Sequence, residues 1–288
     1  MRISNAMMAN NIQGYLSKHT ESLLNIQERI ASGKRINRPS DDPVGMQKVL
    51  DYTKQVSGLD QYNNNITIAQ NHVNSVDDIL SAVTDLLSQA KKIAADTEPD
   101  MRATLADQVD ILREQVVQLA NSKDNGNYIF AGDLTDIQPF DPTTGVYSGD
   151  NGTKDYLIGD GLQINIQADG SQIFETGGTS VFDVLTDLST QLRANNSAGI
   201  TAQMPLLDDA VQTLNSTRAV NAGKYQLMDA TSKHNSLFKV NVQDLLSKTQ
   251  DTDIAAAAID FSVEQTAYQS TLATAAKIVQ PSLMDYLK

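Results

Sequence analysis

Histidine is the side chain best suited to acid–base or metal chemistry, and this chain has three, His19, His72 and His234, far apart in the sequence. It contains no HExxH, GxSxG, GxxxxGK[ST] or GxGxxG arrangement and no cysteine. Those patterns place a base, a nucleophile or phosphate-binding amides next to one another. Without them, the sequence predicts no enzyme, no bound cofactor and no thiolate metal site.

One oxygen-rich segment could contact a cation. Asp150, Asn151 and Asp155 lie in the run SGDNGTKDY, and carboxylate and amide oxygens are the ligands of Ca²⁺. The spacing does not match an EF-hand loop, so we interpret the segment as a solvated hairpin turn and predict no metal site.

The composition indicates a helical protein. The 288 residues are 40% hydrophobic but only 5% aromatic, which favours a core of Leu, Ile, Val and Ala in one or two domains. The net charge of -13 argues against nucleic-acid binding, which needs clustered Lys and Arg.

The sequence has no stretch of the roughly 20 apolar residues that cross a bilayer. Its first twenty residues lack the apolar region of a cleavable signal peptide. We therefore expect a soluble protein that does not use the ordinary secretory signal.

Both ends of the chain carry a narrow apolar stripe with alternating spacings of four and three residues. This spacing places the side chains along one face of a helix and is typical of a coiled-coil contact. The N-terminal stripe comprises Ile12, Leu16, His19, Leu23, Ile26 and Ile30. The C-terminal stripe comprises Ile254, Ala258, Phe261, Gln265, Tyr268, Leu272, Ala275 and Val279.

We interpret these stripes as assembly interfaces that pair with each other or with other chains. The alternative is that they belong to ordinary amphipathic helices of a closed bundle. Isolated helices of this kind are marginal, so we expect the terminal segments to be disordered until a partner is present.

A break follows the first stripe. Gly33 suits a helix end, Pro39 prevents continuation, and Ser40 or Asp41 can cap a new helix near Pro43. Further apolar stripes predict helices over about 44–95, 105–119, 181–192 and 206–247. Short strands are predicted at 128–130, 145–147, 156–158 and 162–166, between Gly and Asp turns.

These elements give a mainly α fold with a small β insertion. We expect a long antiparallel helical rod, with both termini at one end and the β-hairpin domain at the other. The segments are a terminal coiled coil at 1–41 and 250–288, a helical rod at 42–127 and 180–249, and a β domain at 128–179.

Four segments of the chain together resemble the flagellin superfamily. They are the opening MRIS, the break SGKRI followed by SDDP, the run GNYIFAG at 126–132, and SLMDYL at 282–287. The residues of the break that carry the motif are Ser32, Gly33, Arg35, Asp41, Asp42 and Pro43. The segments GNYIFAG and SLMDYL are most similar to the hook–filament junction proteins of that superfamily.

The resemblance implies a structural adaptor of the extracellular bacterial flagellum. It would be exported by the flagellar type III apparatus with a chaperone, and would form a ring between the first junction protein on the hook side and flagellin on the filament side. Three alternatives stay open: a flagellin filament subunit, a secreted coiled-coil tip protein of a type III secretion apparatus, and an enzyme built on the β insertion.

Overall fold

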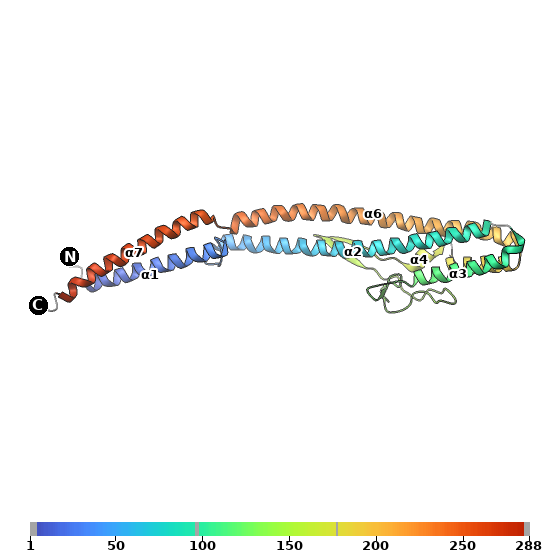
Figure 1. The fold of residues 1–288 in the computed structure, drawn as a ribbon, viewed down its shortest axis with the longest axis horizontal. Coiled ribbons are helices and arrows are strands. Elements are labelled where there is room, and N and C mark those ends of the chain that lie inside the picture. Colours follow the sequence, from blue (N-terminus) through green and yellow to red (C-terminus); the bar gives the residue numbers. More distant parts are fainter. Residues whose placement is uncertain (1–4, 96–97, 177, 285–288) are drawn as a thin grey trace. The chain divides into compact units, whose positions relative to one another are not determined.

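The computed structural model describes residues 5–95, 98–176 and 178–284; the side chains of residues 5, 6, 9, 176 and 277–284 are outside this description. The chain divides into two compact units. Unit 1 comprises residues 1–58 and 238–288, and unit 2 comprises residues 59–237. Figure 1 labels the helices that form them.

Unit 1 is built on two antiparallel helices, α1 (Asn5–Ser32) and α7 (Ile254–Met284), which lie side by side in Figure 1. Their direction follows from two contacts. His19 Nδ1 lies 2.6 Å from Glu264 Oε1, and Arg29 Nη2 donates to Thr252 Oγ1 at 3.3 Å. The first part of α2 (Pro43–Ala95) and the last part of α6 (Ser197–Gln250) complete the unit.

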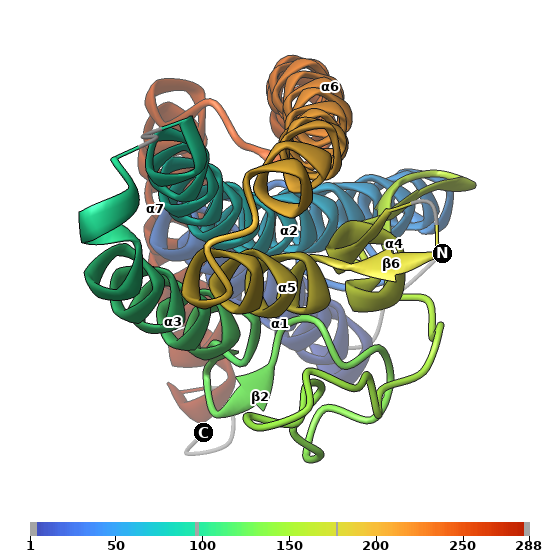
Figure 2. The ribbon, with the colours of Figure 1, turned by 90° about the vertical axis from the view of Figure 1, so that its right-hand side faces the viewer.

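Unit 2 contains the rest of α2 and α6 together with α3 (Arg102–Ala120) and α5 (Val181–Arg193). A short 3₁₀ turn, Pro99–Met101, precedes α3. Figure 2 looks along these helices and shows them side by side. Their aliphatic faces share one core, which includes Leu80, Val109, Leu188 and Leu214. The predicted mainly helical fold is therefore confirmed.

Over the residues that the structure describes, the strands form three two-stranded antiparallel ladders. They pair β1 (Lys123–Asp124) with β2 (Asn127–Tyr128), β3 (Asp155–Gly159) with β4 (Leu162–Asn165), and β5 (Glu175–Thr176) with β6 (Thr179–Ser180). The short helix α4 (Gly170–Phe174) precedes β5. Isolated two-stranded hairpins are marginal in water, so these ladders depend on packing against the helices.

An aromatic cluster joins the loops to the helical core. Phe140 contacts Phe174, Phe182 and Tyr147 with ring centroids 5.1–5.2 Å apart. Phe130 meets Phe174 edge-on at 5.3 Å. The β segments therefore share a core with α2, α3 and α5, although the chain has few aromatic residues.

The hairpin β3–β4 is held to two helices by asparagines. Asn65 on α2 donates to the carbonyl of Leu157 at 2.7 Å, and the buried Asn235 on α6 donates to the carbonyl of Ile158 at 3.0 Å. Beneath them, Ile158 packs in a second apolar cluster with side chains of α2 and α6.

Some local predictions differ from the structure. Residues 145–147, predicted as a strand, contribute only a single bridge from Tyr147 to Phe140, because the chain turns within Asp141–Gly145. The strand expected at 128–130 is limited to its first residue, since Ile129 and Phe130 enter the core. The ladder β5–β6 was not predicted.

The last long rod helix begins earlier than predicted. Helix α6 starts at Ser197 and contains Pro205. A proline lacks the N–H that an interior helical position donates and usually ends a helix, so the residues before Pro205 carried no helical signal.

The predicted segment limits near residues 42 and 250 fall at helix ends, whereas the two compact units divide within α2 and α6. The β segments lie in unit 2 with the helices because they share its core. The expected disorder of the terminal segments before assembly stays a prediction.

Candidate assembly surfaces

The break between α1 and α2 is a hydrogen-bonded corner, which we call the α1–α2 corner (residues 32–45). Gly33 ends α1 with φ +69°, a conformation that costs other residues strain. Its carbonyl accepts from the N–H of Thr252 at 2.9 Å, and the N–H of Arg35 donates to the carbonyl of Gln250 at 2.6 Å. The corner is thereby joined to the α6–α7 connection.

The two aspartates of the corner have separate roles. Asp41 Oδ2 accepts from the N–H groups of Arg38 and Asn37 at 2.8 and 3.0 Å, and these bonds lower the pKa of Asp41. Asp42 Oδ1 accepts from the N–H of Gly45 at 2.8 Å, so Asp42 caps α2 and Pro43 is its first residue. The predicted cap at Ser40 or Asp41 is wrong, because Asp41 turns back toward the loop.

Close packing completes the corner. Ile36 is fully buried. A Cβ added to Gly45 would lie 2.5 Å from Ile36 Cδ1 and 2.4 Å from Asp42 Oδ2. Arg35 reaches the carbonyl of Thr249 at 3.0 Å and lies 3.6 Å from Asp42, while Ser32 Oγ accepts from the N–H of Lys34 at 3.1 Å. The family-motif residues therefore shape this corner.

On α1, every residue of the N-terminal stripe is turned away from solvent. Ile26 is buried, and Ile12, Leu16, Leu23 and Ile30 are half-buried. Because α7 is the helix that contacts α1, this stripe covers the face that packs on α7.

On α7, the C-terminal stripe is split between two faces. Phe261, Tyr268 and Ala275 are half-buried, whereas Ile254, Ala258 and Leu272 are exposed. Gln265, the polar member of the stripe, is also exposed, and the side chain of Val279 lies outside the described residues. The face covered in the monomer also includes Ala257, Glu264, Ala267 and Thr271.

The sequence pattern did not identify those four residues because three are small or hydroxylated and one is charged. A signal was present, since Glu264 is one of only three charged residues in α7. A charge inside an apolar helix calls for a partner, and His19 on the α1 stripe supplies it.

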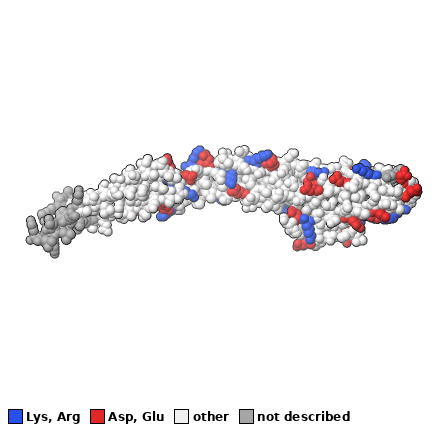
Figure 3. All heavy atoms as spheres, viewed as in Figure 1, with Lys and Arg blue, Asp and Glu red and all other residues white. Residues whose placement is uncertain are grey.

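Apolar side chains surround α7. Ile259 and Val263 are 66% and 63% exposed, and Ile254 and Leu272 are also exposed. A helix that is hydrophobic all round is normally buried on all sides. The surface of α1 away from the stripe likewise exposes Met7, Tyr15 and Leu24. Charged atoms are sparse over the described part of these two helices in Figure 3.

We define the outer face of α1 and α7 by its exposed apolar residues: Met7, Tyr15, Leu24, Ile254, Ile259, Val263 and Leu272. These side chains lie on more than one side of the two helices, and together they leave apolar area that another protein can cover.

The oxygen-rich segment forms turns of the loop that follows β2. Asp150 Oδ1 accepts from the N–H of Asp133 at 2.6 Å, and Gly152 packs against Asp133. Among the described residues, no three His, Cys, Asp or Glu side chains are grouped to hold a metal. In the same part of the chain, no helix is both long and apolar enough to cross a membrane.

Long helices and a hydrogen-bonded corner that contains the sequence motif characterise this chain as a helical structural protein. Residues 3–135 match the family described as the bacterial flagellin N-terminal helical region. The chain is also similar to proteins named flagellar hook-associated protein 3.

Two curated relatives carry that name. The protein of Salmonella typhimurium is 34% identical over 183 residues, covering 61% of this chain and 57% of the relative. The Escherichia coli protein is 29% identical over 255 residues, covering 86% of this chain and 77% of the relative. The matched part of the chain thus spans little more than half of the Salmonella protein.

Solved structures share the fold. A putative flagellar hook-associated protein from Vibrio parahaemolyticus matches with a TM-score of 0.69 at 20% identity, covering 73% of this chain and 100% of that one. Flagellar hook-associated protein-3 from Legionella pneumophila matches with a TM-score of 0.63 at 14% identity, covering 69% and 98%.

Proposed function

We propose that this chain is a structural subunit of the bacterial flagellum and acts as the adaptor between the hook and the flagellin filament. The observation that carries the proposal is the outer face of α1 and α7. It exposes large apolar side chains on helices whose inner faces are already paired. Similarity to proteins named flagellar hook-associated protein 3 supports the junction as the place where that surface is covered.

Assembly follows from the geometry of the surface. The outer face differs from the inner face that α1 and α7 use for each other, so neighbouring copies can pack without disturbing the monomer's own pair. Contacts between two different surfaces extend from copy to copy and generate rings or helical tubes. A ring of copies, with the first junction protein on one side and flagellin on the other, would bury the exposed residues.

Export and partners complete the proposal. We propose that the chain leaves the cell through the flagellar type III apparatus, protected by a chaperone, and that it has no catalytic activity. In the extracellular flagellum its role is mechanical. The loops near Asp133 and Asp150 form a polar surface of unit 2.

A flagellin filament subunit is the principal rival. Flagellin of Bacillus subtilis is 24% identical over 300 residues and covers 97% of both chains. That match is longer than the matches to the hook-associated proteins but weaker in identity.

Deletion of the gene in its own host tests the proposal. For a junction adaptor, cells keep hooks, lack filaments and release flagellin monomers into the medium, because flagellin has no adaptor on which to assemble. If the cells make no flagellin at all, the chain is the filament subunit. Normal swimming would reject both roles. Polymerisation of the purified chain alone into long filaments would also contradict the adaptor.

A further inference from the structure

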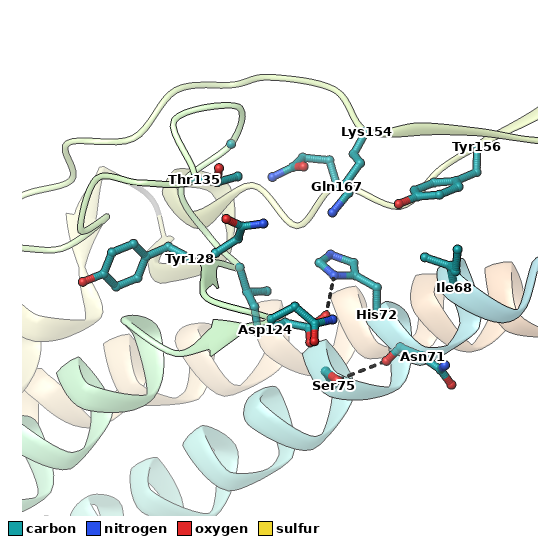
Figure 4. Close-up of a pocket in the computed structure, with 14 residues that line it drawn as sticks. Ile68, Asn71, His72, Ser75, Asp124, Tyr128, Thr135, Lys154, Tyr156 and Gln167 are labelled. Carbon is teal, nitrogen blue, oxygen red and sulfur yellow. Dashed lines mark hydrogen bonds and ion pairs between the residues drawn. The ribbon is translucent and has the colours of Figure 1, made fainter. Parts of the chain in front are cut away.

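Unit 2 contains a pocket that the assembly role does not use. It has a volume of ≈ 390 Å³ and lies between α2, the hairpin β1–β2 and the segment that leads into β3. In Figure 4, Lys154, Gln167 and Tyr156 lie on one side of His72, and Asp124 lies on the other. Volumes of roughly 300–1,000 Å³ are typical of small-molecule sites.

The wall of the pocket mixes hydrogen-bond donors and acceptors. Lys154 can only donate and Asp124 can only accept, while the amides of Asn71, Asn127 and Gln167 do both. One positive and one negative side chain balance each other. An anionic ligand would therefore face Asp124, and a cationic one would face Lys154. A neutral ligand with hydroxyl groups, which both donate and accept hydrogen bonds, is repelled by neither of these charged side chains.

His72 adds an unsatisfied acceptor to this wall. Its side chain is only 8% exposed, and Nδ1 lies 3.7 Å from Asp124 Oδ2. Burial, and then the charge of Lys154, lowers the pKa of His72, against the opposing effect of Asp124, so the ring is neutral near pH 7. The carboxylate favours the proton on Nδ1, which leaves a lone pair on Nε2.

That second ring nitrogen has no partner. Nε2 is buried and has no hydrogen bond within the described part of the chain. A buried polar atom without a partner costs free energy, and a hydroxyl group that reaches it would donate the missing bond.

The pocket also has an apolar edge. Ile68 and Tyr156 lie together on one side of His72 in Figure 4. One face of the Tyr128 ring is already covered by Lys123 Nζ, 4.3 Å from the centroid. Tyr156 and Ile68 therefore supply the apolar contact, which the C–H face of a sugar ring can meet.

We propose that this pocket binds one neutral saccharide unit, with its hydroxyl groups bonded to Lys154, Gln167 and His72. The amide-rich wall, the balanced charge and the apolar edge each match this ligand class. The proposal is independent of the role at the junction, because it rests on side chains of unit 2 alone.

Binding can be measured on the full chain by NMR, with glucose, galactose and N-acetylglucosamine as probes at up to about 10 mM, since a Kd of 1 mM is already weak. We expect at least one of them to shift the His72 and Lys154 side-chain signals saturably. Lys154→Ala should weaken binding about tenfold or more, as for loss of a hydrogen bond from a charged donor.

Two further variants make the result specific. Asn71→Ala changes an exposed residue of the pocket and keeps the test available if Lys154→Ala does not fold. Gln138→Ala changes an exposed residue outside this pocket and should leave binding unchanged. The proposal is overturned if no saccharide gives a saturable shift, if Gln138→Ala weakens binding equally, or if inorganic phosphate or a neutral peptide binds more tightly.

Discussion

The main-chain N–H of Arg35 donates to the carbonyl of Gln250 at 2.6 Å. This bond joins the α1–α2 corner to the end of α6, and the bond from Thr252 to Gly33 lies beside it. The corner therefore fixes how the paired helices α1 and α7 leave the rest of unit 1. The most recognisable sequence motif of the chain is therefore a structural joint.

Gly33→Ala should loosen the corner. Gly33 has φ +69° and open space around its Cβ position, so the penalty is backbone strain of about 1–2 kcal/mol. Asn tolerates this conformation better, so Gly33→Asn should lose less. Amide hydrogen exchange at Thr252 is the measurement, and faster exchange is expected for the alanine variant. Equal exchange in both variants would show that strain does not control the joint.

Gly45→Ala should destabilise the chain by steric overlap. Its Cβ would fall 2.4 Å from Asp42 Oδ2 and 2.5 Å from Ile36 Cδ1, and overpacking of this kind costs about 1–3 kcal/mol. Gly58→Ala is the control on the same helix, because nothing lies within 4 Å of its Cβ position. That change should stabilise α2 by up to about 1 kcal/mol. Urea denaturation should move the two midpoints in opposite directions.

Asn235→Ala should release the β3–β4 hairpin from α6. The change leaves the carbonyl of Ile158 without its 3.0 Å hydrogen bond in a buried place, at a cost of about 1–3 kcal/mol. Asn215→Ala, at an exposed position of the same helix, should change stability little. Hydrogen exchange along residues 155–165 reports the release, and protection that matches the wild type would refute this role.

The stability of unit 2 should fall as the solution is acidified below about pH 6.5, the ordinary pKa of histidine. Burial lowers the pKa of His72 in the folded chain. The unfolded chain therefore binds the proton at a higher pH, and folding stability is lost as the pH falls from 6.5 toward the lowered value.

The measurement is urea denaturation between pH 8 and pH 5. His72→Gln should flatten the pH dependence over that range. A slope that persists in His72→Gln would assign the effect to another group.

Val263→Asp should block assembly without unfolding the monomer. Val263 is 63% exposed on α7, so the charge stays hydrated in the free chain but loses water when a partner covers it. Val220→Asp is the matched control, at a 56% exposed position of α6 in unit 2. In a host that lacks the gene, Val220→Asp should restore filaments, whereas Val263→Asp should leave flagellin in the medium. Filaments with both variants would show that α7 is not the assembly surface.

The helices could be predicted from the sequence because their apolar spacing is regular over many turns. The predicted helix over 44–95 corresponds to α2 at Pro43–Ala95, and the one over 181–192 corresponds to α5 at Val181–Arg193. The cap of the last helix also follows from local residues, since Asp253 Oδ1 accepts from the N–H of Ala255 at 2.9 Å. Such elements depend on nearest neighbours along the chain.

The β region was less predictable. The predicted strands at 156–158 and 162–166 correspond to β3 and β4. The surface on which they pack could not be predicted, because Asn65, Asn235 and the apolar cluster around Ile158 come from distant parts of the chain. The aromatic cluster around Phe140 joins residues that are up to fifty positions apart in the sequence. Neither arrangement leaves a periodic signal.

The sequence by itself determined the helical class, the long helices, the inner stripe of α1 and the site of the break at Gly33. Only the tertiary structure decided which face of α7 packs on α1. Helix α7 carries apolar residues at many spacings, so its sequence allows several faces, and in the structure the packed face is the one on which Glu264 meets His19. That choice leaves Ile254, Ile259 and Val263 outside, where a second molecule can cover them.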